Sequence, residues 1–278
     1  MKLITVLIPA FNYPDGVSKI LDIFEKNPSI EIELIVADDS SNNQVAEIVQ
    51  KYNDRNPGLV IYYHNNPSLG AVANWNSLLY KATGQYVLFM HHDEYPIGEL
   101  FVDTLISKLS ACKDIDILVL SCQIVSKGGV IRPHLPLFIQ SLVLKYFPSY
   151  LFRRNVIGSP SCLIVRKSIY PSFDVLLQWF VDVDLYFQLF TKKYRWIISN
   201  NLQIASMTRE SGSITNSLSD NLSSVIVSEY EYLREKYPNA TFWLSPESNL
   251  FVSYFEKLAW VLLRVVTISI RRVFKLFT

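Results

Sequence analysis

The chain has 278 residues, of which 50% are hydrophobic and 18% are charged, and its formal net charge is +1. This composition excludes an intrinsically disordered chain, and the near-neutral charge gives no overall basic surface for a nucleic-acid partner. The length is sufficient for one large domain or two closely packed ones. Three cysteines have no zinc-binding spacing and leave one unpaired in any disulfide scheme, which favours a reducing compartment.

The first 97 residues alternate between strand-like and helix-like segments. Apolar, β-branched runs at 3–8, 32–37, 59–63 and 85–90 are separated by segments with helical spacing of apolar residues, around 15–25, 43–53 and 71–82. Pro9 ends the first run, because proline cannot donate to a sheet. The order β-α-β-α-β-α-β predicts a parallel sheet with right-handed crossovers and helices on both faces.

The second half of the chain is less regular. The pattern predicts helices at 98–111, 179–190 and 219–236 and strands at 115–126, 130–132, 162–165 and 196–205, with Gly128-Gly129 as a hairpin-like turn. Asp182 and Asp184 are two residues apart on the second of these helices and therefore cannot share one face. We expect one of them to point towards the site and the other to be solvated.

Polar residues follow three of the predicted strands, at 9–12, 38–41 and 91–94. Ligands of open α/β sheets bind beyond the carboxyl ends of parallel strands, so these segments predict a binding crevice. Carboxylates alone would repel a diphosphate, whereas a divalent cation between them would attract it, which favours a metal-bridged nucleotide. The alternative for 91–94 is a polar turn that closes a core strand, and Asp38 and Asp39 could also serve as a helix N-cap pair.

Glycine-rich phosphate loops do not occur at the predicted crevice. The chain has neither a Gly-x-Gly-x-x-Gly turn nor a Gly-Lys-Ser/Thr loop in these positions. We therefore expect no dinucleotide site and no P-loop.

The segment 251–278 is apolar and basic. It carries five basic residues and one acidic residue, a net +4, so the rest of the chain is near −3 (+1 minus +4). Charges interrupt the apolar residues too often for a membrane span, but the pattern is typical of a basic amphipathic helix that lies in a membrane interface. A helix packed on the domain is the alternative.

Four segments in order carry a family resemblance. They are Val-Leu-Ile-Pro-Ala-Phe-Asn from residue 6, Ile-Val-Ala-Asp-Asp-Ser-Ser from residue 35, Leu-Gly-Ala-Val-Ala-Asn-Trp-Asn from residue 69 and Ala-Thr-Gly-Gln-Tyr-Val-Leu-Phe-Met from residue 82. Residues 1–215 resemble a family 2 glycosyltransferase of the GT-A fold, particularly the bacterial enzymes that assemble O-antigen and capsular polysaccharides. The resemblance implies a Rossmann-like, mostly parallel central sheet flanked by helices, followed here by a C-terminal helical extension.

The resemblance also implies roles for individual residues. His91-His92-Asp93 replaces the family's Asp-x-Asp, so Asp93 is the expected ligand of Mn²⁺ or Mg²⁺, and Glu210 occupies the place of a histidine that assists the metal. Asp182 is the expected catalytic base. The residues expected to surround the nucleotide-sugar are Pro9, Ala10, Phe11, Asn12, Asp39, Gly70, Asn74 and His92.

The implied reaction is a single displacement with inversion at the anomeric carbon of a nucleotide-sugar donor. The expected acceptor is a lipid-linked glycan, and the expected location is the cytoplasmic face of the inner membrane, contacted through the C-terminal helix. Residues 1–97 would bind the donor, 98–215 would hold the acceptor and the base, and 216–278 would form the C-terminal helices. The altered metal motif leaves open an inactive, binding-only relative, and a sugar-nucleotide-forming enzyme is the other alternative.

Overall fold

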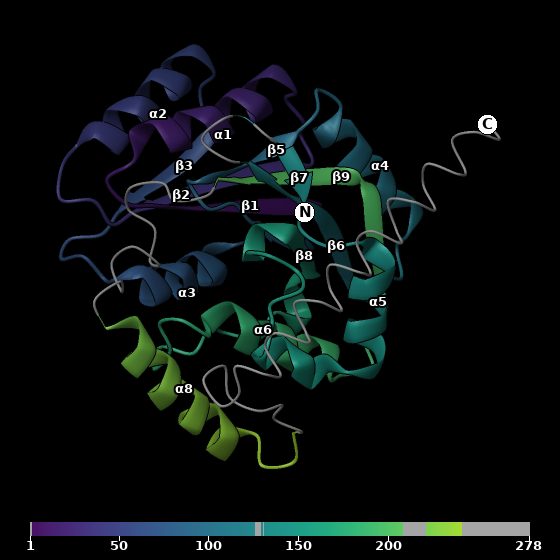
Figure 1. The fold of residues 1–278 in the computed structure, drawn as a ribbon. Coiled ribbons are helices and arrows are strands. Elements are labelled where there is room, and N and C mark those ends of the chain that lie inside the picture. The colour runs from purple at the N-terminus through teal and green to yellow at the C-terminus, as the bar shows by residue number, and fades with distance from the viewer. Residues whose placement is uncertain (1, 126–128, 130, 208–220, 241–278) are drawn as a thin grey trace.

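A computed structural model describes residues 2–125, 129, 131–207 and 221–240. Within these residues the fold is a nine-stranded sheet with helices on both sides, and in Figure 1 α1 and α2 lie on one side while α3 and α6 lie on the other. The strands are β1 (Ile4–Ala10), β2 (Ile32–Asp38), β3 (Val60–His64), β4 (Tyr86–Phe89), β5 (Glu94–Ile97), β6 (Ile117–Val125), β7 (Ile131–Pro133), β8 (Leu163–Arg166) and β9 (Trp196–Met207).

Each helix that the sequence predicts within the described residues is present, and α5 is a further helix that the sequence did not predict. The helices are α1 (Pro14–Lys26), α2 (Gln44–Arg55), α3 (Ala71–Lys81), α4 (Phe101–Ala111), α5 (Leu137–Tyr146), α6 (Val181–Phe190) and α8 (Leu222–Lys236), with short 3-10 helices η1 (Pro148–Phe152), η2 (Pro160–Cys162) and η3 (Lys167–Ile169). The prediction of an α/β sheet flanked by helices is confirmed.

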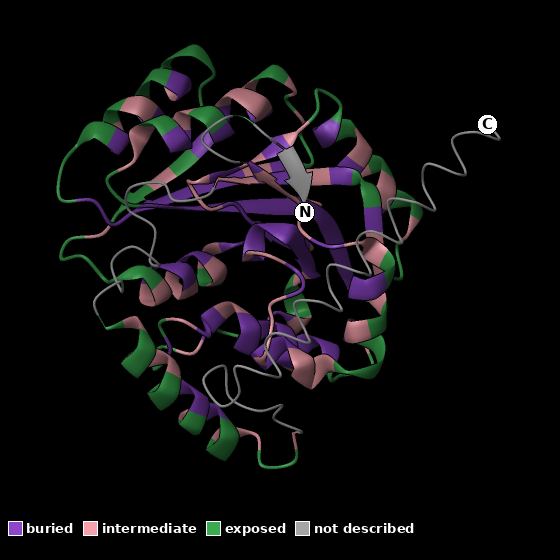
Figure 2. Cartoon of the chain, in the orientation of Figure 1, coloured by how far each residue is buried: buried purple, intermediate pink, exposed green. Residues whose placement is uncertain are grey.

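The first four strands form the parallel part of the sheet, in the order β3-β2-β1-β4. All residues of β1 and β4 are buried, as expected for strands covered by helices on both faces. Figure 2 shows this buried centre in purple, with exposed positions on the outer faces of the surrounding helices. Parallel pairing places the carboxyl ends of these strands at one edge of the sheet, where the predicted site residues follow.

The second half extends the same sheet with mixed pairing. β8 is antiparallel to β4 and β6, whereas β6 and β9 are parallel. The sequence did not predict β5, which begins at Glu94 and pairs antiparallel with the end of β9, so that Glu94 lies opposite Ser206. Glu94 is therefore fixed in a strand rather than in a turn, and one sheet contains strands from both halves of the chain.

Helix α8 is attached to α6 by a cluster of polar contacts. Lys236 lies 2.9 Å from a carboxylate oxygen of Asp184 and 2.6 Å from one of Asp174. The hydroxyl of Tyr237 donates to Asp184 over 2.6 Å. The expectation that one of Asp182 and Asp184 is solvated is wrong, because Asp184 is fully buried in this ion pair.

The segment 241–278, including the predicted basic amphipathic helix at 251–278, lies outside the described residues. Among the residues that the structure does describe, no helix is both long enough and apolar enough to traverse a bilayer.

Candidate functional site

Three strand ends meet at the carboxyl edge of the parallel strands. After β1 and β2, the N–H of Asp39 donates to the carbonyl of Ala10 over 2.9 Å, and the N–H of Asn12 donates to Ser40 Oγ over 2.7 Å. After β4, the ring Nδ1 of His92 lies 3.3 Å from the carbonyl of Pro9. The sequence therefore correctly predicts that these segments converge.

The predicted nucleotide-contact segment after β1 has both buried and exposed parts. Pro9 and Ala10 are buried, so they reach the edge of the sheet through their backbone, whereas the side chain of Phe11 is 47% exposed. Asn12 adopts a left-handed conformation with φ 50°, which asparagine tolerates better than most residues. Phe11 and Asn12 are thus the members of this segment whose side chains are available to a ligand.

Asp39 holds the loop between β3 and α3. Its carboxylate accepts four hydrogen bonds, and the donors are Asn65 Nδ2 (3.0 Å), Ser68 Oγ (2.7 Å), the N–H of Leu69 (2.7 Å) and the N–H of Gly70 (2.8 Å). Burial acts to raise the pKa of Asp39, but these hydrogen bonds together outweigh it and lower the pKa. Four bonds fill the acceptor capacity of a carboxylate, so Asp39 shapes the site by fixing this loop.

Gly70 and Asn74 support the same loop. Gly70 has φ 81°, a conformation that favours glycine, and its carbonyl accepts the N–H of Asn74 at the start of α3. Asn74 is 2% exposed, donates to the carbonyl of Ala37 over 3.0 Å and accepts from Asn65 over 2.9 Å. Its amide is therefore directed to β2 and Asn65 rather than to a surface.

His91 is held at the end of β4 by contacts from two other segments. Its ring lies against the indole of Trp75, with centroids 4.8 Å apart and planes at 39°, and its backbone N–H donates to Ser161 Oγ over 3.0 Å. The ring Nε2 is buried and has no hydrogen-bond partner among the residues that the structure describes. Burial lowers the pKa of His91 to about 4, more than the nearby Asp93 carboxylate raises it, so the imidazole is neutral at physiological pH.

His91, Asp93 and Glu94 form a group of potential metal ligands. One ligand atom from each of the three side chains lies within 4.8 Å of the others. The neutral imidazole presents an unpartnered nitrogen, and the two carboxylates supply negative charge, so this donor set fits a divalent cation. Sequence reasoning placed Asp93 here but gave His91 no ligand role, although His91 stands in the first position of the altered Asp-x-Asp motif.

Glu94 is 3% exposed and accepts a hydrogen bond from the hydroxyl of Ser159. Burial raises the pKa of Glu94 to about 7, and the neighbouring charge of Asp93 acts in the same direction. The hydroxyls of Ser159, Ser161 and Ser206 oppose this shift. A carboxylate in this environment gains stability from any cation placed beside it.

Asp182, in the first turn of α6, lies within electrostatic range of this group. Burial raises its pKa to about 8, and the charges of Glu94 and Asp93 contribute to the shift. Strongly perturbed pKa values in a cluster of acidic groups are typical of functional sites. Asp182 therefore lies near enough to Asp93 and Glu94 for their charges to affect its pKa, and its role as the catalytic base stays a prediction.

Tyr170 is a further site residue that the sequence did not indicate. Tyr170 is 9% exposed, and within the described part of the chain its buried hydroxyl has no hydrogen-bond partner. Burial raises the pKa of Tyr170, and the charge of Asp182 adds to the effect. In the sequence, Tyr170 follows a predicted strand near other aromatic residues, and this pattern does not indicate that it lies beside Asp182. The other expected metal residue, Glu210, lies outside the described residues.

The strand ends define an α/β ligand-binding site with acidic and imidazole groups at its centre. Residues 5–171 match the model of the family described as glycosyl transferase family 2. That match covers more than half of the chain, and the chain belongs to this family.

Sequence relatives match only part of this chain. The UDP-Glc:alpha-D-GlcNAc-diphosphoundecaprenol beta-1,3-glucosyltransferase WfaP of Escherichia coli is 30% identical over 95 residues, which are 34% of this chain and 37% of that protein. The poly(ribitol-phosphate) beta-N-acetylglucosaminyltransferase TarS of Staphylococcus aureus is 31% identical over 105 residues, which are 37% of this chain and 18% of that protein. The matched parts thus span well under half of these relatives.

Solved structures share the fold. TarS 1–349 of S. aureus in complex with UDP-GlcNAc superposes with a TM-score of 0.60 at 20% identity, covering 77% of this chain and 61% of that one. The mannosyltransferase PcManGT of Pyrobaculum calidifontis, in complex with GDP-Man and Mn²⁺, gives a TM-score of 0.53 at 17% identity, covering 75% and 58%. These similarities establish the GT-A fold.

Proposed function

We propose that the protein is an inverting glycosyltransferase that moves a sugar from a nucleotide-sugar to a lipid-linked glycan during synthesis of a surface polysaccharide. The observation that supports this most directly is the grouping of Asp182 with His91, Asp93 and Glu94 at the carboxyl edge of the parallel strands. Family membership supplies the reaction class. The names of WfaP and TarS suggest a UDP-linked hexose or N-acetylhexosamine as the first donors to test.

The donor nucleotide would lie along the ends of β1 and β2. Phe11 and Asn12 offer exposed side chains there, and Asp39 fixes the loop that leads into α3. Asp39 would serve the base either through the backbone of this loop or by exchanging one of its four hydrogen bonds for one from the base. His92, packed edge-on against Tyr13 with centroids 5.5 Å apart, would lie near the ribose.

Asp182 would act as the catalytic base. As the acceptor hydroxyl attacks the anomeric carbon, its proton passes to the Asp182 carboxylate and the bond between that carbon and the diphosphate oxygen breaks. Attack from the face opposite the diphosphate inverts the configuration. A carboxylate whose pKa is raised to about 8 is a stronger base than an ordinary aspartate, and general-base catalysis typically contributes ~10²–10⁴-fold.

His91, Asp93 and Glu94 would hold a divalent metal ion, Mn²⁺ or Mg²⁺. When bound, the ion would supply positive charge for the departing diphosphate. The unpartnered Nε2 of His91 supports this assignment, because an orphaned buried nitrogen beside two carboxylates gains a partner when a cation binds. Glu210 remains a proposed contributor.

The proposed location is the cytoplasmic face of the inner membrane. A lipid-linked acceptor is an amphiphile that stays in the bilayer, so an enzyme that uses it must work at the surface. The basic, apolar segment 251–278 supports such a location, because its net +4 would attract anionic lipid.

The decisive test is a screen of UDP-glucose, UDP-N-acetylglucosamine, UDP-galactose and GDP-mannose by thermal shift, with and without Mn²⁺. Transfer from the best donor to a diphosphate-lipid-linked N-acetylhexosamine would follow. We expect transfer with the wild-type protein and at least ~10²-fold less with Asp182→Asn at unchanged donor affinity. Donor binding without hydrolysis or transfer to any lipid-linked acceptor would favour a binding-only relative.

A further inference from the structure

Helix α5 presents an apolar face to solvent. Phe138, Leu142 and Tyr146 recur every four residues and are 51%, 50% and 57% exposed, and Phe147 continues the face at 55%. The opposite face of the helix is buried, with Ile139, Gln140 and Leu144 turned towards the core. The described part of the chain leaves this apolar face exposed, and a contiguous patch of this kind marks an interaction surface.

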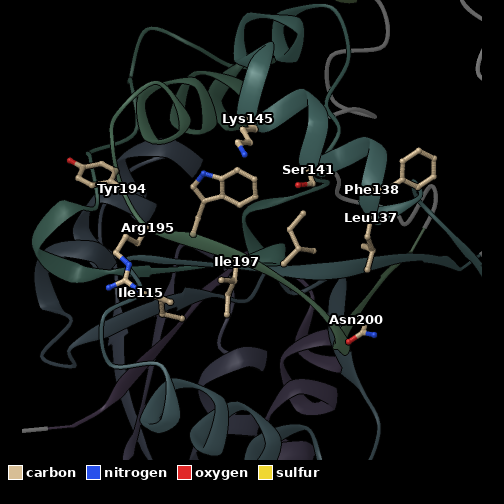
Figure 3. Close-up of a pocket in the computed structure, with 11 residues that line it drawn as sticks. Ile115, Leu137, Phe138, Ser141, Lys145, Tyr194, Arg195, Ile197 and Asn200 are labelled. Atoms are coloured by element: carbon tan, nitrogen blue, oxygen red, sulfur yellow. The ribbon is translucent and has the colours of Figure 1, made fainter.

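A groove of about 920 Å³ lies between α5 and the beginning of β9. Figure 3 shows its two walls, with Ser141 and Lys145 on α5 and Arg195 and Ile197 on the strand side. Leu137, Phe138 and Trp196 add apolar and aromatic surface to the lining. The groove thus joins apolar walls to two basic side chains at the edge of the exposed face.

The charge around this surface is positive. Helix α5 and the 3-10 helix η1 that packs against it, with the two residues that follow, span 137–154 and contain Lys145, Arg153 and Arg154 but no Asp or Glu. The loop that leads into β9 adds exposed Lys192 and Lys193. Two acids partly offset this charge, because Asp114 lies 3.2 Å from Arg195 and Asp116 accepts the backbone N–H of Arg195 over 2.9 Å. The partner that fits such a surface is apolar and anionic.

We propose that the α5 face and its groove form a membrane-contact surface that docks against a bilayer containing anionic lipid. Aromatic and aliphatic side chains beside basic ones are the composition of an interfacial helix, and each basic group near such a surface adds about 1 kcal/mol, or roughly fivefold in binding. A second copy of the chain would bring positive charge against positive charge. The segment 251–278 is also a poor occupant of this surface, because its net charge of +4 would be repelled by the basic residues there.

The position of this surface is compatible with the proposed function. Trp196, in the groove, lies opposite Ile117 at the start of β6, whereas Ser206 lies opposite Glu94 at the other end of β9. A bilayer against α5 therefore leaves the carboxyl edge of the parallel strands open to the nucleotide-sugar. The proposal extends the proposed peripheral location and rests on it, but not on the transfer chemistry.

The test is sedimentation of the full chain with vesicles of phosphatidylcholine alone or mixed with phosphatidylglycerol. The variants are Phe138→Ser with Leu142→Ser, and Lys145→Glu. Matched controls are Tyr80→Ser, at a side chain that is 90% exposed on α3, and Lys51→Glu on α2. We expect each α5 variant to bind mixed vesicles about tenfold less well than wild type, with unchanged melting temperature, and the controls to bind as wild type.

The outcomes separate the proposals. If the α5 variants bind as well as wild type, the α5 surface is refuted and membrane binding belongs to another part of the chain. Failure of the wild-type chain to bind mixed vesicles refutes both membrane proposals while leaving sugar transfer untouched. If binding falls equally for the controls, a general charge effect replaces the proposed surface.

A different observation concerns the start of α6, the helix that carries Asp182. The first N–H groups of a helix have no partner within the helix, and the residue before α6 supplies no side-chain cap. Glu229 of α8 instead binds the segment that leads into the helix. Its carboxylate accepts from the N–H groups of Gln178 (2.6 Å), Trp179 (3.1 Å) and Phe180 (2.9 Å), and it is 6% exposed.

We infer that Glu229 is a positioning residue for Asp182. Three hydrogen bonds to consecutive N–H groups fix residues 178–180, which lead into α6 directly before the proposed base. A carboxylate also interacts favourably with the positive end of the helix dipole. Displacement of a catalytic group by about 1 Å can cost ~10²-fold in rate. The contact between Glu229 and residues 178–180 would therefore control kcat without touching substrate.

The inference rests on the proposed base, and its test uses Glu229→Gln, Glu229→Asp and the exposed α8 control Glu231→Gln. We expect Glu229→Gln to lower kcat by about tenfold or more with donor KM unchanged, and to shift the pH profile of kcat. Glu229→Asp should recover part of the activity, and Glu231→Gln should match wild type.

Two results would contradict the positioning role of Glu229. Unchanged kcat and pH profile in a folded Glu229→Gln variant refute the positioning role, and so does a lower melting temperature with no kinetic change. If Glu229→Gln does not fold, the same comparison is made with Glu229→Asp. Full activity of Asp182→Asn would instead refute the base, which distinguishes the two failures.

Discussion

The carboxylate of Asp39 accepts the N–H of Gly70 over 2.8 Å, and this bond joins the end of β2 to the first residue before α3. Three further donors from the same loop complete the contact. Asp39 thus links two neighbouring parts of the proposed nucleotide site. The family resemblance places Asp39 at the nucleotide-sugar, and the structure adds an architectural role.

Replacement of Asp39 should therefore affect both folding and nucleotide binding. Asp39→Ala leaves four donors without their acceptor, and we expect a loss of about 2–4 kcal/mol in the free energy of unfolding. Asp39→Asn replaces one acceptor oxygen with a donor and should weaken UDP binding by about tenfold or more, ~1.4 kcal/mol. Urea unfolding and calorimetric titration with UDP measure the two effects. Asp54→Ala, at an exposed site on α2, is the control, and UDP affinity in Asp39→Asn equal to wild type would contradict this role.

His91 should set the preference among metal ions. Carboxylates suit both Mn²⁺ and Mg²⁺, but Mn²⁺ is a transition-metal ion and accepts an imidazole nitrogen more readily than Mg²⁺, which takes oxygen ligands. We expect His91→Ala to weaken Mn²⁺ binding by about tenfold, ~1.4 kcal/mol. His91→Asp, which recreates the Asp-x-Asp pattern, should move the preference towards Mg²⁺. Calorimetric titration with each metal measures both, with the exposed His64→Ala as control. Equal Mn²⁺ affinity in wild type and His91→Ala would remove His91 from the ligand set.

Much of the first half of the fold could be predicted from the sequence, because local patterns determine it. Continuous apolar runs, such as that before His91, are typical of strands covered on both faces. Polar residues after each run identified the edge where Asn12, Asp39 and Asp93 gather. These signals are local in the chain, and the parallel βαβ order then fixes which strand ends lie together.

The parts that the sequence did not predict depend on contacts between distant segments. Asp184 looks like a surface acid in a helical pattern, but Lys236 and Tyr237 of a later segment bury it. Glu94 looks like part of a turn, yet its strand is defined by β9, more than a hundred residues later. The orphan nitrogen of His91 depends on the positions of Trp75 and Ser161. Such pairings leave no periodic signal in the sequence.

Gly16 allows α1 to approach the segment after β4. A Cβ atom at this position would lie 1.9 Å from the carbonyl oxygen of His92, a backbone atom that cannot move alone. We expect Gly16→Ala to displace the 91–94 segment and to lower Mn²⁺ affinity by about tenfold, ~1.4 kcal/mol, as well as stability.

Gly58→Ala provides the control for this prediction. Gly58 has φ +79° and room for a Cβ, so alanine there should cost only the conformational penalty of about 1–2 kcal/mol and leave metal binding unchanged. Calorimetric titration with Mn²⁺ on both variants, with melting temperatures measured alongside, gives the comparison. Wild-type metal affinity in Gly16→Ala would show that the close approach does not position the metal ligands.

The acidic cluster should make the metal-free protein less stable as the pH rises. The pKa of Asp182 is raised to about 8 by burial and by the charges of Glu94 and Asp93, whereas an unfolded aspartate has a pKa of about 3.9. Between these values the folded state holds a proton that the unfolded state lacks, so the free energy of unfolding falls with rising pH. Glu94, at about 7, acts in the same direction.

Asp182→Asn removes the part of this pH-dependent loss of stability that comes from ionising Asp182. In the presence of a chelator, we expect its melting temperature to exceed that of wild type near pH 8 by about 2–4 °C per kcal/mol gained, with little difference near pH 4. Asp174→Asn should instead have a lower melting temperature than wild type near pH 8. Burial opposes ionisation of Asp174, but its contacts with Lys236, Leu176 and Tyr232 together lower its pKa, so its charge stabilises the fold above about pH 4 and the variant loses that stability. Thermal denaturation of the three proteins across this range measures both effects, and a stability of Asp182→Asn that tracks wild type at every pH would show that Asp182 carries no buried-charge cost.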